Sequence, residues 1–426
     1  MSWLIICLPI ILIAYLGVRE KSRNQANIEK IPLRINVNGI RGKSTVTRLT
    51  FSILREAGYE VIGKTTGSAT RMLFWDQEAE ECIDRPPAGP SIKEQVRVID
   101  RAAKYGAKAL VCECMAVRPE YQDIYQNVMF KAQLTVIVNT LKDHLDEMGP
   151  TTTQIAWAFA KSIPENGILI VPEDEFTDYY SAEAEKLGSR VISFAENRVP
   201  EALHGLIAKG IFPANCAAAL AVAKALEIPE DVAIRGILKA APDPGAMRIQ
   251  EISSAKGNGF FVNAFAANEP ESSLKIWDLI GRLNLPLDNP LILFNTRADR
   301  VDRTRLFAKD FFPLLPEAEV VVIGESAKSF IKEVKRGRYP KITRVYDLTQ
   351  HSTAEIAKIL QSLAGGRTIF AVGNLHGAGE EVIMELAREG NLMATDRVRI
   401  KEAFAGLPPS TLNPDDFRTS TDEENL

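Results

Sequence analysis

The segment Asn36–Thr45 constrains this chain more than any other stretch of its sequence. It follows the apolar, alternating run Leu33–Ile35, and it precedes a helical pattern over Val46–Ala57. Two glycines let the backbone approach an oxyanion, amide groups at the start of a helix point toward it, and a lysine with a hydroxyl completes a triphosphate-binding loop. Because Val37 occupies the position of the first consensus glycine, an ordinary turn between a strand and a helix is the alternative interpretation.

Length and composition indicate a globular protein. The 426 residues allow two or three domains, and 46% of them are hydrophobic and 25% charged. The formal net charge of −4 provides no basic excess for neutralising phosphates, which argues against nucleic acid as a partner. The five cysteines contain no pair spaced as C-x-x-C, so we expect a reducing compartment rather than a zinc site or a disulfide framework.

The N-terminus departs from the globular pattern. Residues Trp3–Val18 carry no charge, and Arg19, Lys21 and Arg23 follow directly. The run is short for a membrane-spanning helix, although roughly 17 residues can suffice. Because basic residues stay on the cytoplasmic side, we expect a single membrane helix over residues 1–24, which places the protein at the cell membrane with its catalytic domains in the cytoplasm. A buried or interfacial helix is the alternative.

Strand-like and helix-like stretches alternate through the rest of the chain, which indicates an α/β fold with parallel sheets covered on both faces. We predict a P-loop ATPase domain over residues 30–243 and a smaller Rossmann-like domain over residues 244–394. The boundary is expected after Asp243, where Pro and Gly interrupt the helical pattern. The tail, residues 395–426, is expected to be flexible. The expected strands lie near residues 60–63, 109–114, 134–139, 167–171 and 191–194, and then near 259–263, 291–294, 320–323 and 368–372.

Polar side chains collect at the carboxyl ends of these strands, where parallel sheets bind ligands. Glu113 ends an apolar run that would bury it, and a lone buried carboxylate is too costly to stay charged without a partner. The segment Asp143–Asp146 adds the densest set of metal-capable groups. We therefore expect a Mg²⁺ or Mn²⁺ ion near the phosphates, held partly by Glu113 and His144. A loop histidine that caps a helix is the alternative for His144.

Three motifs together carry a family resemblance: Gly39–Thr45, Glu113 and Val138–Asp146. In order and spacing they are similar to the ATPase-domain motifs of the Mur ligase superfamily, and Phe370–Gly377 resembles a segment of the poly-γ-glutamate synthases within it. The resemblance implies an ATP-dependent amide ligase. Such an enzyme activates the terminal carboxylate of a glutamate polymer as an acyl phosphate and joins the next glutamate through a γ-amide bond.

The resemblance also implies roles for individual residues. The implied catalytic residues are Lys43, Glu113, His144, Lys161 and Arg248, the nucleotide-binding residues are Gly39, Arg41, Gly42, Lys43, Ser44, Thr45 and Asn215, and the metal ligands are Ser44, Thr45, Glu113, His144 and Lys161. Lys161 would be carbamylated, with a solvated helix lysine as the alternative. Arg297 and Asp299 follow a later strand. At that position we favour contact with nucleotide or substrate, and a solvent-exposed position at the rim of the site is the alternative. Asn263 stands where the family expects a ribose-binding aspartate.

The partners implied by the resemblance are glutamate, a glutamate polymer and the integral membrane subunits of a synthase and export complex. A homo-oligomer is left open. Two other functions are compatible with the motifs. The nearer one is a folylpolyglutamate-type or other ligase of the same superfamily, and the farther one is a membrane-tethered P-loop kinase or regulator of polysaccharide export.

Overall fold

The computed structural model describes residues 2–67, 70–83, 91–142, 145–243, 246–267, 269–283, 285–388 and 390–394. The chain forms two compact units. Unit 1 contains Met1–Leu203 and Phe212–Asp243, and unit 2 contains His204–Ile211 and Pro244–Leu426. The tail 395–426, for which flexibility was expected, lies outside the described residues.

Unit 1 is built on a sheet in which the described residues form eight strands, in the order β4-β3-β2-β5-β1-β6-β7-β8. The six strands from β2 to β8 in that order run parallel, as predicted, whereas β3 and β4 pair antiparallel at one edge. The strands are β1 (Leu33–Asn38), β2 (Val61–Thr65), β3 (Arg71–Phe74), β4 (Glu81–Cys82), β5 (Ala109–Glu113), β6 (Leu134–Ile137), β7 (Ile168–Pro172) and β8 (Arg190–Phe194).

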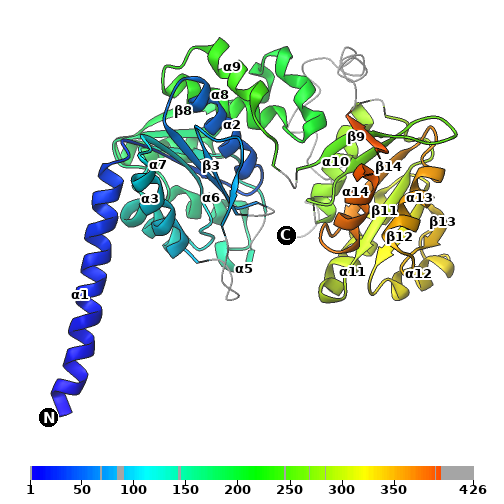
Figure 1. The fold of residues 1–426 in the computed structure, drawn as a ribbon, viewed down its shortest axis with the longest axis horizontal. Coiled ribbons are helices and arrows are strands. Elements are labelled where there is room, and N and C mark those ends of the chain that lie inside the picture. The colour runs from blue at the N-terminus through cyan, green and yellow to red at the C-terminus, as the bar shows by residue number, and fades with distance from the viewer. Residues whose placement is uncertain are drawn as a thin grey trace, which may run out of the picture. The chain divides into compact units, whose positions relative to one another are not determined.

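The helices of unit 1 connect the strands of this sheet or flank it in the sequence (Figure 1). They are α1 (Ser2–Glu29), α2 (Lys43–Glu56), α3 (Lys93–Tyr105), α4 (Pro119–Ile124), α5 (Leu145–Met148), α6 (Thr152–Ala160), α7 (Thr177–Lys186), α8 (Pro213–Ala225) and α9 (Glu230–Lys239), with a π-helical turn at Tyr125–Phe130. The central strands β1, β5 and β6 consist almost entirely of buried residues. Because the three strands are parallel, their polar carboxyl ends lie at the same end of the sheet, where α2 begins.

Unit 2 holds a second sheet, whose described strands follow the order β13-β12-β11-β14-β10-β9-β15. The strands β10 to β14 are parallel, and β9 pairs antiparallel with both β10 and β15. The strands are β9 (Arg248–Ile252), β10 (Gly259–Asn263), β11 (Leu291–Thr296), β12 (Ala318–Gly324), β13 (Ile342–Asp347), β14 (Thr368–Gly373) and β15 (Leu392–Ala394); the helices are α10 (Pro270–Arg282), α11 (Val301–Asp310), α12 (Lys328–Lys335), α13 (Thr353–Leu363) and α14 (Ala378–Arg388).

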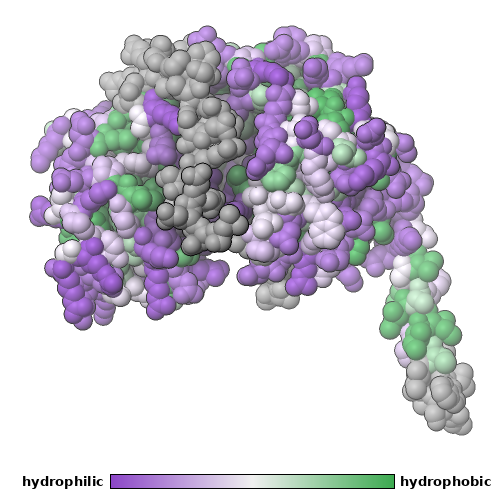
Figure 2. Space-filling model, turned by 180° about the vertical axis from the view of Figure 1, so that it is seen from behind, coloured by the Kyte–Doolittle hydropathy of each residue, from purple (hydrophilic) through white to green (hydrophobic). Residues whose placement is uncertain are grey.

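Helix α1 projects from unit 1, and Figure 2 shows hydrophobic residues along its described part. Its large apolar side chains between Ile10 and Val18 are exposed. Beyond Arg19 the helix continues through charged residues. Among the residues that the structure describes, no helix has both the length and the apolarity needed to cross a membrane. The expected membrane anchor over residues 1–24, and with it the expected location at the cell membrane, is therefore wrong.

The second half of α1 is fixed to unit 1 by polar contacts. Arg23 and Asn27 both donate to the Asp100 carboxylate on α3, at 2.8 and 3.0 Å. The buried Arg34 guanidinium donates to the carbonyls of Ile28 and Ile31 at the end of α1, and to those of Phe130 and Lys131 at the end of the π-helical turn. Burial lowers the pKa of Arg34 to about 10. One cation thus joins the end of α1 to the first strand of the sheet.

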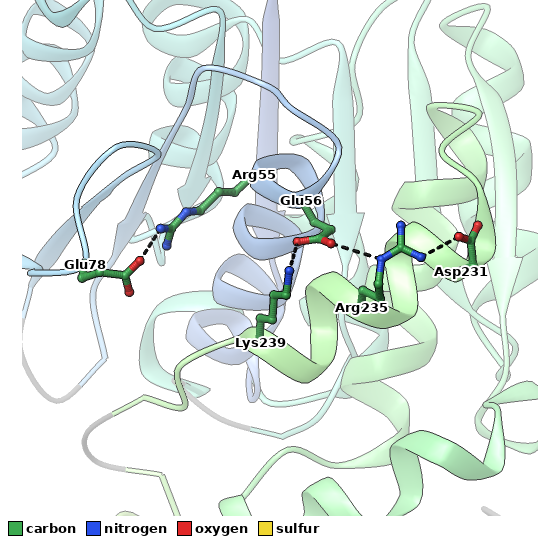
Figure 3. A network of polar contacts seen from close by, with 6 residues as sticks. All are labelled: Arg55, Glu56, Glu78, Asp231, Arg235 and Lys239. Atoms are coloured by element: carbon green, nitrogen blue, oxygen red, sulfur yellow. Dashed lines mark hydrogen bonds and ion pairs between the residues drawn. The ribbon is translucent and has the colours of Figure 1, made fainter.

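Helix α2 packs closely against α9. A Cβ atom added at Gly236 would lie 2.6 Å from the Ile53 Cα and 2.9 Å from the Ser52 carbonyl oxygen. At the end of this contact, Glu56 accepts hydrogen bonds from Lys239 at 2.6 Å and from Arg235 at 3.2 Å (Figure 3). Exposed ion pairs of this kind contribute little stability, so the close backbone approach is the main determinant of how α9 sits on α2.

We expect Gly236→Ala to lower the free energy of unfolding of unit 1 by about 1–3 kcal/mol, because the new methyl group meets backbone atoms that cannot rotate away. The measurement is thermal or urea-induced unfolding. Gly281→Ala in α10 is the matched control, since its Cβ would lie 3.8 Å from the nearest atom, in ordinary van der Waals contact. Equal losses in the two variants would contradict the packing argument.

Candidate functional site

The loop between β1 and α2 takes a conformation that requires its two glycines. Gly39 has a φ of 125° and Gly42 a φ of 83°. A Cβ at Gly39 would lie 3.1 Å from the backbone nitrogens of Val138 and Asn139, and a Cβ at Gly42 would lie 2.4 Å from the Asn215 Nδ2. The loop is thus pressed against the end of β6 on one side and against the first turn of α8 on the other.

Asn139 fixes the shape of this loop with its side-chain amide. Its Oδ1 accepts from the backbone N–H of Ile40 at 3.2 Å and of Arg41 at 3.1 Å, and its Nδ2 donates to the Arg41 carbonyl at 2.9 Å. Sequence reasoning placed Asn139 in a motif but gave it no role. The signal was an amide side chain at a strand end next to a phosphate-binding loop, but only the tertiary structure shows its partners.

Glu113 lies at the end of β5 and is 4% exposed. Its Oε2 accepts a hydrogen bond from the Ser44 hydroxyl at 2.8 Å and another from the Thr66 N–H at 2.6 Å. The structure thus brings together two of the predicted site residues, one from the loop helix and one from the neighbouring strand. A carboxylate beside a hydroxyl is an all-oxygen donor set, which suits a hard cation such as Mg²⁺.

Lys43 and Asn215 also lie at this loop. The Lys43 ammonium donates to the carbonyls of Gly39 at 2.8 Å and Ile40 at 3.0 Å. Asn215 is buried in the first turn of α8, where its Oδ1 accepts from the Phe212 N–H at 3.2 Å. The loop's lysine and the asparagine predicted to bind nucleotide therefore flank the same glycine-rich backbone.

A buried ion cluster, which was not predicted from the sequence, lies around Arg48 on α2, the helix that follows the loop. Arg48, 1% exposed, lies one turn after Ser44 on α2 and forms an ion pair with Glu80. Its Nε lies 3.6 Å from the Asp243 Oδ2. The hydrogen bond from Arg48 holds the pKa of Glu80 below its ordinary value. A Cβ at Gly67 would meet the Ser44 Oγ at 2.8 Å and the Asp243 Oδ2 at 3.0 Å, so the cluster reaches the Ser44 side of the site.

Other predicted site residues are not brought to Glu113 by any contact that the structure shows. Lys161 follows α6, is exposed, and places its Nζ 5.4 Å from the centre of the Trp157 ring. Asp143 and His144 lie outside the described residues. Within the described part of the chain, no three His, Cys, Asp or Glu side chains gather into a metal-binding group.

The remaining predicted site residues belong to unit 2. Arg297 and Asp299 follow β11 and pair with each other at 2.8 Å, both partly exposed. Arg248 begins β9, directly opposite Asn263 on β10. The Arg248 Nε is buried and has no hydrogen-bond partner among the described residues. The carboxyl ends of β11 and β14 are joined by Asn295 and Asn374, whose side-chain amides each donate to the other's backbone carbonyl.

Comparison with known proteins identifies both units. The Mur ligase middle domain matches residues 37–209, and the poly-gamma-glutamate synthase CapB C-terminal domain matches residues 249–389. The PGA synthase CapB of Bacillus subtilis is 45% identical over 383 residues, which cover 90% of this chain and 97% of that protein. The capsule biosynthesis protein CapB of Bacillus anthracis is 43% identical over 380 residues, covering 89% and 82%.

Solved structures show the same fold at low sequence identity. FolC of E. coli, in complex with ADP and without folate substrate, has a TM-score of 0.60 at 17% identity and covers 89% of this chain and 98% of its own. The bifunctional folylpolyglutamate synthase/dihydrofolate synthase of Yersinia pestis, complexed with AMPPNP and Mn ion, has a TM-score of 0.58 at 15% identity, with coverages of 87% and 93%. From the relatives, the family models and the fold together, the chain belongs to the CapB family of poly-γ-glutamate synthases, which are ATP-dependent amide ligases with a Mur ligase fold.

Proposed function

We propose that this chain extends a glutamate polymer by activating its terminal carboxylate with ATP and joining the next glutamate through a γ-amide bond. The observation that carries the proposal is the contact between the buried Glu113 carboxylate and the Ser44 hydroxyl of the phosphate-binding loop. This contact joins the phosphate-binding loop to a carboxylate at the carboxyl end of β5. A carboxylate is a poor acyl donor, so transfer of the γ-phosphoryl group to it creates the acyl phosphate that an amine can attack.

In this proposal each part of the loop has a separate role in binding ATP. The amides after Gly39 and Gly42, held by Asn139, face the phosphates, and the Lys43 ammonium turns from its loop carbonyls to the β- and γ-phosphates. Ser44 and Glu113 hold a Mg²⁺ ion, together with Thr45, His144 and a carbamylated Lys161 as the resemblance implies. The ion would neutralise charge on the phosphates and on the tetrahedral intermediate. Asn215 contacts the adenine, and Arg248, Arg297 and Asp299 contribute from unit 2 to nucleotide or substrate binding.

The nearer rival, a folylpolyglutamate-type ligase, shares the fold but only 17% identity with this chain, against 45% for the PGA synthase. The partners that we propose are glutamate, the polymer, and separate integral membrane subunits of a synthase and export complex. The name of the Bacillus anthracis relative, a capsule biosynthesis protein, supports this, because a capsule lies outside the cell.

The first test is the ligase reaction itself. We expect the chain, supplied with ATP, Mg²⁺, glutamate and a γ-glutamyl acceptor, to release ADP in step with amide formation. Lys43→Ala should lower this rate by about 100-fold or more, since it removes a charged donor from the transferring phosphoryl group. Lys224→Ala, an exposed lysine on α8, serves as the control. Polymer synthesis that persists in Lys43→Ala, or that prefers a folate acceptor, would sink the proposal.

Asn139→Ala tests the geometry of the loop. The variant loses three hydrogen bonds to the loop backbone, so we expect the affinity for a non-hydrolysable ATP analogue to fall about ten-fold or more. Titration calorimetry measures this directly. Asn127→Ala removes an exposed asparagine that bonds only to Asp123 among the contacts described for it, and it should bind the analogue normally. Equal binding by both variants would refute a positioning role for Asn139.

Lys161 allows a chemical test of the proposed carbamate. If the carbamate is a metal ligand, Lys161→Ala lowers turnover, and added formate or acetate partly restores it by supplying the missing carboxylate. Lys186→Ala on α7 is the matched control for loss of an exposed lysine. Turnover that is unchanged in Lys161→Ala would instead assign the lysine to the surface beside Trp157, with which it makes its one described ring contact.

A further inference from the structure

A cavity of about 310 Å³ lies between the antiparallel edge of the unit 1 sheet and helix α3. Its apolar wall is formed by Met72 on β3, Ile83 after β4 and Val98 on α3. The other wall carries three cations of α3, namely Lys93, Arg97 and Arg101. All three are exposed, and they follow one another at intervals of four residues, so they form one stripe along the helix.

The stripe stands out in a chain whose formal net charge is −4. No acidic side chain in the described part of the chain forms an ion pair with Lys93 or Arg97, whereas Arg101 pairs with Glu81 on β4. The acidic residue that lines the cavity, Glu94, is itself bound at 2.8 Å to the fully buried Lys64 ammonium. The wall of α3 therefore presents net positive charge to whatever occupies the cavity.

The cavity lies next to the candidate active site. Gln95, which adjoins Glu94 on α3, donates its side-chain N–H to the backbone carbonyl of Glu113 at 3.4 Å. Lys64, which pairs with Glu94, lies two residues before Thr66, whose N–H binds the Glu113 carboxylate at 2.6 Å. The cationic stripe thus begins within one helical turn of the strand end that holds Glu113 and runs away from it along α3.

We propose that this cavity binds the growing γ-glutamyl chain, an inference that rests on the proposed function. A γ-linked chain carries one free carboxylate per residue and two methylene groups in its backbone, which matches a surface with cations on one side and apolar residues on the other. Five backbone bonds separate successive residues and span about 6 Å at the extension per bond of an ordinary peptide. Four residues of an α-helix rise by the same length, about 6 Å, so successive carboxylates can reach successive cations of the stripe.

Direct binding tests this assignment without requiring catalysis. The probe is a fluorescently labelled γ-glutamyl octamer, measured by anisotropy at low salt. We expect Lys93→Gln/Arg97→Gln to weaken its binding about ten-fold, since two charged contacts are lost, and Arg97→Gln alone to weaken it about three-fold. Lys186→Gln/Lys224→Gln makes the same charge change at exposed positions on α7 and α8 and should leave binding unchanged. Equal weakening in both double variants, or no octamer binding by the parent chain, overturns the proposal.

Kinetics separate a failed cavity assignment from a failed ligase assignment. In Lys93→Gln/Arg97→Gln we expect the KM for the octamer to rise about ten-fold, while kcat, the KM for ATP and the rate with a single glutamate as acceptor stay unchanged. A rise in KM that is equal for monomer and octamer would overturn the cavity assignment alone. Absence of ADP release by the parent chain with every γ-glutamyl acceptor, alongside normal octamer binding, would overturn the ligase proposal alone.

Discussion

The hydrogen bonds to the buried Glu113 carboxylate are the interaction on which the rest of unit 1 depends. A carboxylate with 4% exposure is costly to bury, and the two donors to its Oε2 come from different elements, the start of α2 and the end of β2. One atom therefore fixes the relative positions of the loop helix and two strands. Asn139 and the two glycines set the shape of the loop, and the loop leads directly into α2, where Ser44 binds Glu113.

A second group of buried charges lies near Glu113, on the same helix α2 that carries Ser44. Arg48 is buried on the helix that begins at the loop, and its partners Glu80 and Asp243 are far apart in the sequence, with Asp243 the last residue of unit 1. Removing one member of a buried pair leaves an uncompensated charge, so such clusters hold their elements in a fixed relation. Together with the close contact between Gly236 and Ile53, the cluster keeps α2 from shifting along the sheet. The phosphate-binding loop therefore stands on a helix that is fixed at both ends.

The sequence could predict those features that are local. The apolar run before Glu113 indicated its burial, the two loop glycines indicated the turn, and the strand at Gly259–Asn263 was placed with its observed bounds. Features that depend on distant partners were missed, such as the roles of Asn139 and Arg48 and the antiparallel pairing of the short strands β3 and β4. The apolar N-terminal run was misinterpreted for a related reason. Its hydropathy was judged alone, whereas the helix extends further, to Arg23 and Asn27, which bind Asp100, and to the Ile28 carbonyl, which accepts from Arg34.

The pairing of Arg248 with Asn263 bears on the electrostatic potential of unit 2. Directly opposed residues of an antiparallel pair share one face of the sheet, where unlike charges attract each other. An aspartate at position 263 would cancel much of the guanidinium's field across the strands. Asparagine offers a dipole but no net charge, so the Arg248 guanidinium has no carboxylate directly opposite it on these two strands. Its charge is therefore not cancelled across this strand pair.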